Sequence, residues 1–313
     1  MSGCASSGPP RQSVTFAEGF DTVGQITSYG SDSFDTDTMA VRARLAELHR
    51  LFDIYNNYDG LNNAKTVNDN AGIAPVTVPN ELFELIRTGV EWHEKTDGKV
   101  NIALGPVLRL WQPFFSAGTG RPSEEELMAA LEMCDIGGVV LDSEKSTVFL
   151  KHAGMSLDLG AVAKGYAAQM AVLESQGSVL LNLGGNVVSN GSPPDGREKW
   201  TLGIANPDKP EEVYRNTYIG IEAGAVVTSG DYQRFYIEDG KRFCHIIDPA
   251  TAMPGTLYRS VTVTGADSGL CDILSTALFL LPQDVGGMLA QENGCEAVWI
   301  LNDLSVIKTD GLP

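Results

Sequence analysis

The sequence predicts an α+β fold in which mainly antiparallel sheets pack with helices in two closely joined lobes. The expected strands outnumber the expected helices, and many of them connect through hairpins. The clearest hairpin signal is Glu-Asp-Gly-Lys at 238–241, between two strand-like runs. The chain has no internal repeat and no long linker, so residues 14–313 are expected to form one domain after a flexible tail at 1–13.

The N-terminal half is expected to be rich in helices. After a strand pair at 14–20 and 25–29, apolar residues at helical spacing predict a helix that Asp37 or Thr38 caps. The segment 55–72 is rich in Asn, Asp and Gly and predicts a loop. Further helices are expected at 80–97, and at 124–133 behind a Ser-x-x-Glu capping box.

The C-terminal half is expected to be rich in strands. Their expected positions are 139–141, 147–150, 178–183, 200–204, 218–221, 234–237, 242–247, 260–264, 297–301 and 305–308. Helices are expected after Leu159 up to Glu174, in the segment that ends at Pro282, and near 285–291.

The composition excludes several classes of partner. The 22 basic and 40 acidic residues give a formal net charge of -18, and such a surface repels nucleic acid and anionic lipid. No apolar run reaches the length of about 18 residues that a transmembrane helix needs. A phosphate-bearing ligand would therefore be held locally, by backbone N–H groups, a lysine or a cation.

The five cysteines show neither metal-site nor disulfide spacing. Four of them have apolar or strand-like neighbours and are expected to be buried thiols. Cys4 differs, because Ser-Gly precedes it and a small, polar, Pro-containing spacer follows, as at the end of a bacterial lipoprotein signal. We expect a lipid anchor at Cys4 that holds the protein outside the cytoplasmic membrane. A mobile cytoplasmic N-terminus is the alternative.

Asp272 and Thr276 lie four residues apart in the string GADSGLCDILSTALFLLP, near the start of an expected helix. Residues at this spacing share one helix face. A carboxylate and a hydroxyl side by side are hard oxygen ligands of the kind that Mg²⁺ prefers. The alternative is structural: an acid in the first turns suits the helix dipole, and a threonine can bond back to a carbonyl.

Four other segments carry candidate chemistry. A strand that ends at Asp158, a glycine turn and a helix with Lys164 one turn in would present N–H groups to phosphate. Two glycines within 182–187 permit close approach of a ligand, and Asp231 belongs to a small polar cluster at the start of a hairpin. His245, in an apolar strand, could act as a base. Each segment also has a structural explanation. The segment with Asp158 and Lys164 could be an ordinary strand–helix junction, and the two glycines could form a simple turn. The cluster with Asp231 could be a solvated turn, and His245 could be a structural residue with its hydrogen bonds satisfied.

In this order, the strings SLDLGAVAKGYA, NLGGNV, TSGDYQRF, HIIDPAT and CDILSTA resemble the FAD:protein FMN transferases, the ApbE family. The resemblance runs from about residue 19 to the C-terminus, with weaker matches at FDTVG, LFDIYNNYDGLNNAKTVN and VNIALGPVLRLWQPF. It implies an ApbE-like, T-fold-related fold. Two departures concern Ala252, where the family commonly has glycine, and Cys271, where it commonly has alanine.

The resemblance also implies roles for individual residues. Mg²⁺ would be bound by the side chains of Asp272 and Thr276 and the backbone carbonyl of Ala161. His245 is the implied general base, and Asp272 acts with it as a catalytic residue. The implied contacts to the flavin nucleotide, including a loop at 111–113, are Tyr55, Trp111, Gln112, Pro113, Asp158, Lys164, Asp231, His245 and Ser275.

The implied activity is the Mg²⁺-dependent transfer of FMN from FAD to a Thr or Ser hydroxyl of a target protein, with release of AMP. The implied partners are FAD as substrate and an FMN-accepting envelope protein of the redox-complex subunit type, with membrane contact through the lipid anchor alone. Two alternatives stay open at this point. One is a metal-dependent FAD pyrophosphatase, and the other is a non-catalytic FAD-binding lipoprotein.

Overall fold

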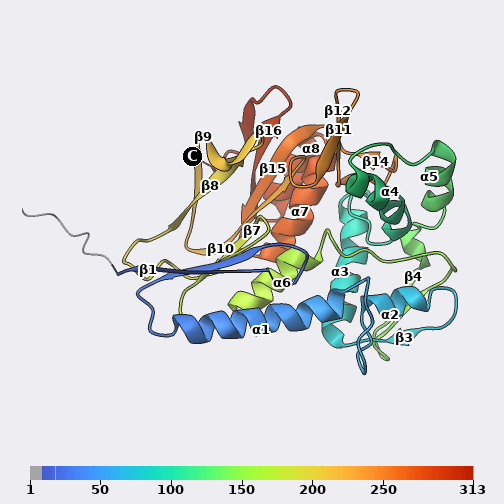
Figure 1. Cartoon of the computed structure of the whole chain (residues 1–313), viewed down its shortest axis with the longest axis horizontal. Coiled ribbons are helices and arrows are strands. Elements are labelled where there is room, and N and C mark those ends of the chain that lie inside the picture. Colours follow the sequence, from blue (N-terminus) through green and yellow to red (C-terminus); the bar gives the residue numbers. More distant parts are fainter. Residues whose placement is uncertain (1–8, 18, 313) are drawn as a thin grey trace, which may run out of the picture.

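The structure is a computed structural model that describes residues 9–17 and 19–312 (Figure 1). Its helices are α1 (Phe34–Phe52), α2 (Ala64–Asp69), α3 (Asn80–Lys95), α4 (Gly105–Ala117), α5 (Glu124–Leu131), α6 (Ala163–Val172), α7 (Ser268–Leu280) and α8 (Gln283–Glu292). Its strands are β1 (Arg11–Phe16), β2 (Gly24–Tyr29), β3 (Val76–Thr77), β4 (Val139–Asp142), β5 (Thr147–Leu150), β6 (Leu180–Leu183), β7 (Asn186–Asn190), β8 (Trp200–Asn206), β9 (Lys209–Ile221), β10 (Ala223–Gly230), β11 (Phe235–Glu238), β12 (Lys241–Cys244), β13 (Ile247–Asp248), β14 (Met253–Pro254), β15 (Tyr258–Gly265), β16 (Glu296–Leu301) and β17 (Val306–Lys308). Among the described helices, none combines the length and apolar character that a membrane crossing needs. Cys4, the expected lipid site, lies outside the described residues.

One large sheet organises the molecule. Its eight strands follow the order β1-β2-β6-β7-β10-β15-β16-β17, and every neighbouring pair is antiparallel. Helix α6 packs against β6 and β7, helix α7 packs against β10 and β15, and α1 lies beside α6 (Figure 1). The prediction of an α+β fold with mainly antiparallel sheets is confirmed.

The alternation of side chains along the central strands separates two cores. In β10, Val227 belongs to the main core under the helices, whereas its neighbour Val226 belongs to a second cluster that includes Trp200 of β8. In β16, Trp299 and Val298 divide in the same way. Because successive strand residues point to opposite faces, the helices cover one face of the sheet and the β8–β9 hairpin covers the other.

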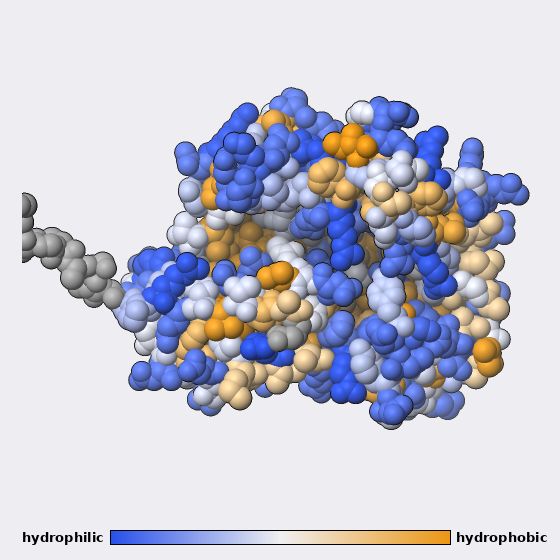
Figure 2. Space-filling model, viewed as in Figure 1, coloured by the Kyte–Doolittle hydropathy of each residue, from blue (hydrophilic) through white to orange (hydrophobic). Residues whose placement is uncertain are grey.

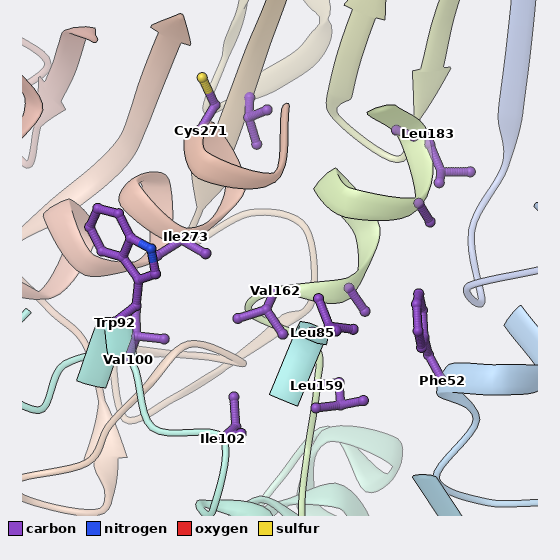
Figure 3. Close-up of a cluster of buried hydrophobic side chains, with 14 of the residues drawn as sticks. Phe52, Leu85, Trp92, Val100, Ile102, Leu159, Val162, Leu183, Cys271 and Ile273 are labelled. Atoms are coloured by element: carbon purple, nitrogen blue, oxygen red, sulfur yellow. The ribbon is translucent and has the colours of Figure 1, made fainter. Parts of the chain in front are cut away.

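The main core also joins the sheet to the helical N-terminal half. Figure 3 shows Val162 and Ile273, from the regions of α6 and α7, in the same cluster as Leu85 of α3 and Phe52 at the end of α1. The three-stranded sheet β3-β5-β4 belongs to this N-terminal half of the chain. The two expected lobes therefore share one continuous core.

The start of α1 differs from the prediction. The helix begins at Phe34 with Ser33 at its N-cap, so Asp37 and Thr38 lie one turn inside it. The buried Asp37 carboxylate instead accepts hydrogen bonds from the backbone N–H of Gln176 at 2.8 Å and from that of its neighbour at 3.2 Å. The Asp37 side chain, which the sequence predicted as a helix cap, therefore bonds to residues that are distant in the chain.

The segment 55–72, predicted as a loop, contains the helix α2. Asn63 and Thr66 form its capping box, because each side chain accepts the backbone N–H of the other. This pairing uses residue types other than Ser and Glu, which explains why the segment resembled a plain loop. The expected tail at 1–13 is also too long, because β1 begins at Arg11 and pairs with β2.

Helix α4 is absent from the prediction, which placed residues 111–113 in a loop. Pro113 lies inside the helix, where a proline normally counts against helical structure. Tertiary packing offsets this cost, since Val107 and Trp111 share a buried cluster with Tyr236 and Phe243 of the β11–β12 hairpin. Helix α4 therefore supports the hairpin that leads to His245.

The polar cluster expected in a turn at 228–231 lies mostly within β10, a central strand of the large sheet. Ser229 is buried there, so the solvated-turn reading is wrong for this residue. The face shown in Figure 2 is largely hydrophilic and is hollowed near its middle.

Candidate active site

Helix α7 places Asp272 against helix α6. Asp267 caps α7 by accepting a hydrogen bond from the Leu270 N–H at 2.7 Å. Asp272 falls in the second turn and is only 4% exposed. Its Oδ2 accepts a hydrogen bond from the Gly165 N–H at 2.8 Å. The carboxylate predicted to bind metal is therefore fixed between two helices.

Gly165 permits this close approach. A Cβ added at this position would lie 2.3 Å from the Ser268 carbonyl oxygen and 2.5 Å from the Asp272 Cβ. Ala161 lies just before α6, which begins at Ala163.

Replacing Gly165 with alanine is expected to destabilise the protein by about 1–3 kcal/mol, because neither backbone can retreat without disturbing the helix contact. Thermal unfolding of the variant checks this. The matched control is Gly287→Ala in α8, where an added Cβ would make only ordinary contacts at 3.7 Å or more. Equal stability of the two variants would show that α6 and α7 can separate freely.

The charge of Asp272 depends on its neighbours. Burial raises its pKa, whereas the Lys164 ammonium, the Asn186 amide and the Gly165 N–H lower it. Asn186 is buried beside the Asp272 carboxylate, and its Nδ2 has no other partner within the described residues. Asn186 was not among the residues predicted at the site, although this residue directly follows the two glycines of NLGGNV.

The two other residues predicted on α7, Thr276 and Ser275, differ in their burial. Thr276 lies one turn after Asp272 and is half-buried. Ser275 is fully buried, and its Oγ lies 2.8 Å from the Ser229 Oγ and 3.0 Å from the Asp272 carbonyl oxygen. Ser275 thus ties α7 to β10, and its expected flavin contact stays a prediction. The described residues contain no cluster of three His, Cys, Asp or Glu side chains that could hold a metal.

His245 follows β12 and is half-buried. Its backbone N–H donates to the Arg234 carbonyl at 3.1 Å, which fixes the residue beside the β11–β12 hairpin. Burial, with the charges of Lys164 and Arg234, lowers its pKa to about 4. Its Nδ1 is buried without a hydrogen-bond partner among the described residues. The side chain is therefore a neutral imidazole at pH 7 with an unused nitrogen.

Asp158 and Tyr55 lie near each other although about a hundred positions separate them in the chain. The Asp158 Oδ1 accepts the Gly160 N–H at 2.8 Å. Burial raises the pKa of Asp158, while Gly160 and the Arg234 charge lower it. Tyr55 is 56% exposed, and Asp53 holds its loop by accepting the Tyr55 N–H at 2.6 Å. Burial and the Asp158 charge raise the Tyr55 pKa.

The three residues predicted at 111–113 do not share one environment. Trp111 is completely buried, and its Nε1 donates to the Ala252 carbonyl at 2.8 Å. This hydrogen bond supports the turn at Ala252. Because the indole is buried, it offers no exposed surface to a ligand. Gln112 and Pro113 are exposed. Ala252 has a φ of 56° and so keeps the left-handed conformation that favours glycine.

Asp231 directly follows β10 and forms ion pairs with two arginines. Its Oδ2 accepts a hydrogen bond from the Arg259 Nε at 2.8 Å and lies 3.2 Å from the Arg242 Nε. Burial raises its pKa in spite of these two arginines. Its Oδ1 is buried without a partner in the described structure. The predicted ligand contact of Asp231 stays a prediction, since the visible interactions are structural ion pairs.

Two cations connect the separate parts of the site. Lys164 of α6 acts electrostatically on both Asp272 and His245. Arg234 acts on His245 and Asp158. The sequence reading named Lys164 but missed Arg234, because an exposed arginine beside a hairpin carries no distinctive local signal. Charge interactions thus link an imidazole, two carboxylates and two cations from α6, α7 and the region of the β11–β12 hairpin.

The fold and this site define an α+β protein in which a neutral imidazole lies near two cationic side chains. A profile of the ApbE family matches residues 20–299, and the chain belongs to this family. The match covers most of the sequence, including every residue predicted at the site.

Relatives and solved structures agree with this assignment. The chain is 35% identical over 271 residues to an FAD:protein FMN transferase of Klebsiella pneumoniae, covering 82% of this chain and 83% of the relative. It is 36% identical over 268 residues to an FAD:protein FMN transferase of Treponema pallidum, covering 79% and 72% of the two chains. The crystal structure of the ApbE protein from Thermotoga maritima superposes with a TM-score of 0.85 at 27% identity, covering 96% of this chain and 97% of that chain.

Proposed function

We propose that this protein transfers FMN from FAD to a Thr or Ser hydroxyl of another protein. The hydroxyl oxygen forms a bond to the FMN phosphorus, the bond from that phosphorus to the bridging oxygen breaks, and AMP leaves with this oxygen. The hydroxyl proton passes to His245. The observation that carries the proposal is the neutral imidazole of His245, whose Nδ1 has no partner in the described structure and whose surroundings include two cations. The names of the relatives support the same reaction.

The residues around Asp272 fit a Mg²⁺ ion. The buried carboxylate has its pKa raised by burial, and a cation would favour its charged form. Ala161 lies just before α6, four residues from the Gly165 N–H that donates to Asp272, and Thr276 lies one turn away on α7. We propose these three as the ligands. When bound, Mg²⁺ would polarise phosphoryl oxygens and neutralise developing charge.

The test of this function is a transfer assay with product analysis. The protein is incubated with FAD, Mg²⁺ and a candidate acceptor, and the acceptor is weighed by mass spectrometry while AMP is measured. An acceptor that gains one FMN, with an equal amount of AMP, supports the transferase. AMP and free FMN at the same rate with or without acceptor would identify a pyrophosphatase. Stable FAD binding without AMP release would identify a binding protein.

The native protein is proposed to be held at the outer side of the cytoplasmic membrane by lipid on Cys4, where it meets an FMN-accepting envelope protein. Ser-Gly-Cys followed by a polar spacer supports this. The expected result is that the full-length gene product fractionates with membranes and that Cys4→Ala moves it to the soluble fraction. Multiple acyl chains hold a protein firmly, whereas one holds only marginally. A native product that is soluble, or that lacks an apolar stretch before Ser2, would contradict the anchor.

A further inference from the structure

Two buried cysteines from different elements lie next to each other at the end of β15. Cys271 belongs to the first turn of α7 (Figure 3), and Cys295 lies between α8 and β16. Their exposed fractions are 0% and 2%, and both residues belong to the main core. Their spacing along the chain did not indicate a pair, because most of α7 and all of α8 separate them in sequence.

Gly265, the last residue of β15, shows how close the two sulfurs are. A Cβ added at this glycine would lie 2.6 Å from the Cys295 Sγ and 3.2 Å from the Cys271 Sγ. Both sulfurs thus border the space of one missing methyl group. The φ of Gly265 lies outside the left-handed region that favours glycine, so the backbone conformation does not require this residue. The space that it leaves is filled by the two thiols.

The two thiols also interact with each other. This interaction is the largest influence on the pKa of each, and it raises the pKa of Cys271 and lowers that of Cys295. The other cysteines that the structure describes are arranged differently. The Cys134 Sγ donates to a carbonyl of α5 at 3.2 Å, and the Cys244 Sγ donates to the Gly255 carbonyl at 3.5 Å. These two thiols have backbone acceptors in separate clusters.

We propose that Cys271 and Cys295 form a disulfide that joins the first turn of α7 to the start of β16. Two sulfurs within 3.2 Å of one point need only small side-chain rotations to reach bonding distance. Disulfides persist in oxidising compartments, and the location proposed above, outside the cytoplasmic membrane, is of this kind.

The bond forms by two thiol–disulfide exchanges with an external disulfide, such as oxidised glutathione. One cysteine thiolate attacks the oxidant, one oxidant thiol leaves, and a mixed disulfide remains. The second cysteine then attacks the sulfur of the first, and the other oxidant thiol leaves. The two cysteines together lose two electrons and two protons, and the oxidant is reduced to two thiols. Because both sulfurs are buried, the exchanges take place while the chain folds or opens locally.

The first test identifies the bond in the purified full chain. The protein is incubated with oxidised glutathione or with dithiothreitol, in buffer and in urea below the unfolding transition, where partial opening gives access to buried sulfurs. Free thiols are then blocked with iodoacetamide in denaturant, and the peptides are identified by mass spectrometry. We expect the peptides of Cys271 and Cys295 to be joined in the glutathione samples. In the dithiothreitol samples both cysteines should be alkylated.

The second test measures the restraint that the bond adds. A disulfide between 271 and 295 constrains the unfolded chain, so the oxidised protein should unfold about 5 °C above the reduced protein. The difference should vanish in Cys295→Ala. It should persist in the control Cys134→Ala, which removes a buried thiol from another cluster.

Several outcomes would overturn the disulfide. If both cysteines are alkylated in every sample, or if either keeps glutathione or joins a different cysteine, the proposed bond does not form. Equal unfolding temperatures of the oxidised and reduced wild type would show that the bond adds no restraint. A difference that persists in Cys295→Ala would assign the effect to another cysteine. None of these measurements depends on FMN transfer, so failure of the proposed function would be a separate result.

Discussion

Replacing Asp272 with alanine is expected to abolish Mg²⁺-dependent release of AMP from FAD. Asp272 is the one carboxylate among the three proposed ligands, and without it a divalent ion would keep only two neutral oxygens. A bound metal supplies several kcal/mol of charge stabilisation to the reaction, so the rate should fall by at least about 100-fold. The measurement is the AMP release rate as a function of Mg²⁺ concentration.

The alanine variant also leaves the buried Gly165 N–H without its acceptor, which costs stability. Asp272→Asn separates the two effects, because its amide oxygen can still accept that N–H while the negative charge is gone. We expect the asparagine variant to fold and to lose Mg²⁺ dependence as fully as the alanine variant. Thr276→Val should act in the same direction but more weakly, because it removes one neutral ligand. Undiminished AMP release by Asp272→Asn at low millimolar Mg²⁺ would rule out the metal site.

The sequence predicted the fold class because its strongest signals are local. The hairpin turn at 238–241 and the capping box of Ser123 and Glu126 both form as expected. Predictions were wrong where distant contacts decide the outcome. Helix α4 tolerates Pro113 because its other face is buried against the β11–β12 hairpin, and this hairpin is more than a hundred residues away.

The candidate site shows the same difference between residues with a local sequence signal and residues that distant contacts bring together. Asp272 and Lys164 were recognisable because each belongs to a distinctive string, and the structure places them within electrostatic reach of each other. Arg234 and Asn186 were missed, because their positions become meaningful only when β7, α7 and the hairpin are brought together. Trp111 shows the opposite case, since its string matched the family while its side chain is fully buried. A motif identifies the segment, but packing decides which of its atoms face a ligand.

Replacing His245 with asparagine is expected to lower FMN transfer by about two orders of magnitude or more while FAD binding persists. A hydroxyl is a poor nucleophile at neutral pH, and a positioned base typically contributes about 10²–10⁴-fold. Asparagine keeps a polar group of similar reach but cannot take the proton. The control is His152→Asn, because His152 is exposed and lies outside the site.

The pH dependence gives an independent check on His245 as the base. The base must be neutral to accept a proton, so activity should fall as the pH drops through the pKa of the imidazole. Burial and the charges of Lys164 and Arg234 lower that pKa from 6.5 to about 4. The acidic limb of kcat/KM, which reports the free enzyme, is therefore expected near pH 4 in the wild type and should be absent in His245→Asn. A variant that transfers FMN at the wild-type rate, or that fails only because FAD no longer binds, would show that His245 contacts the ligand and that another group takes the proton.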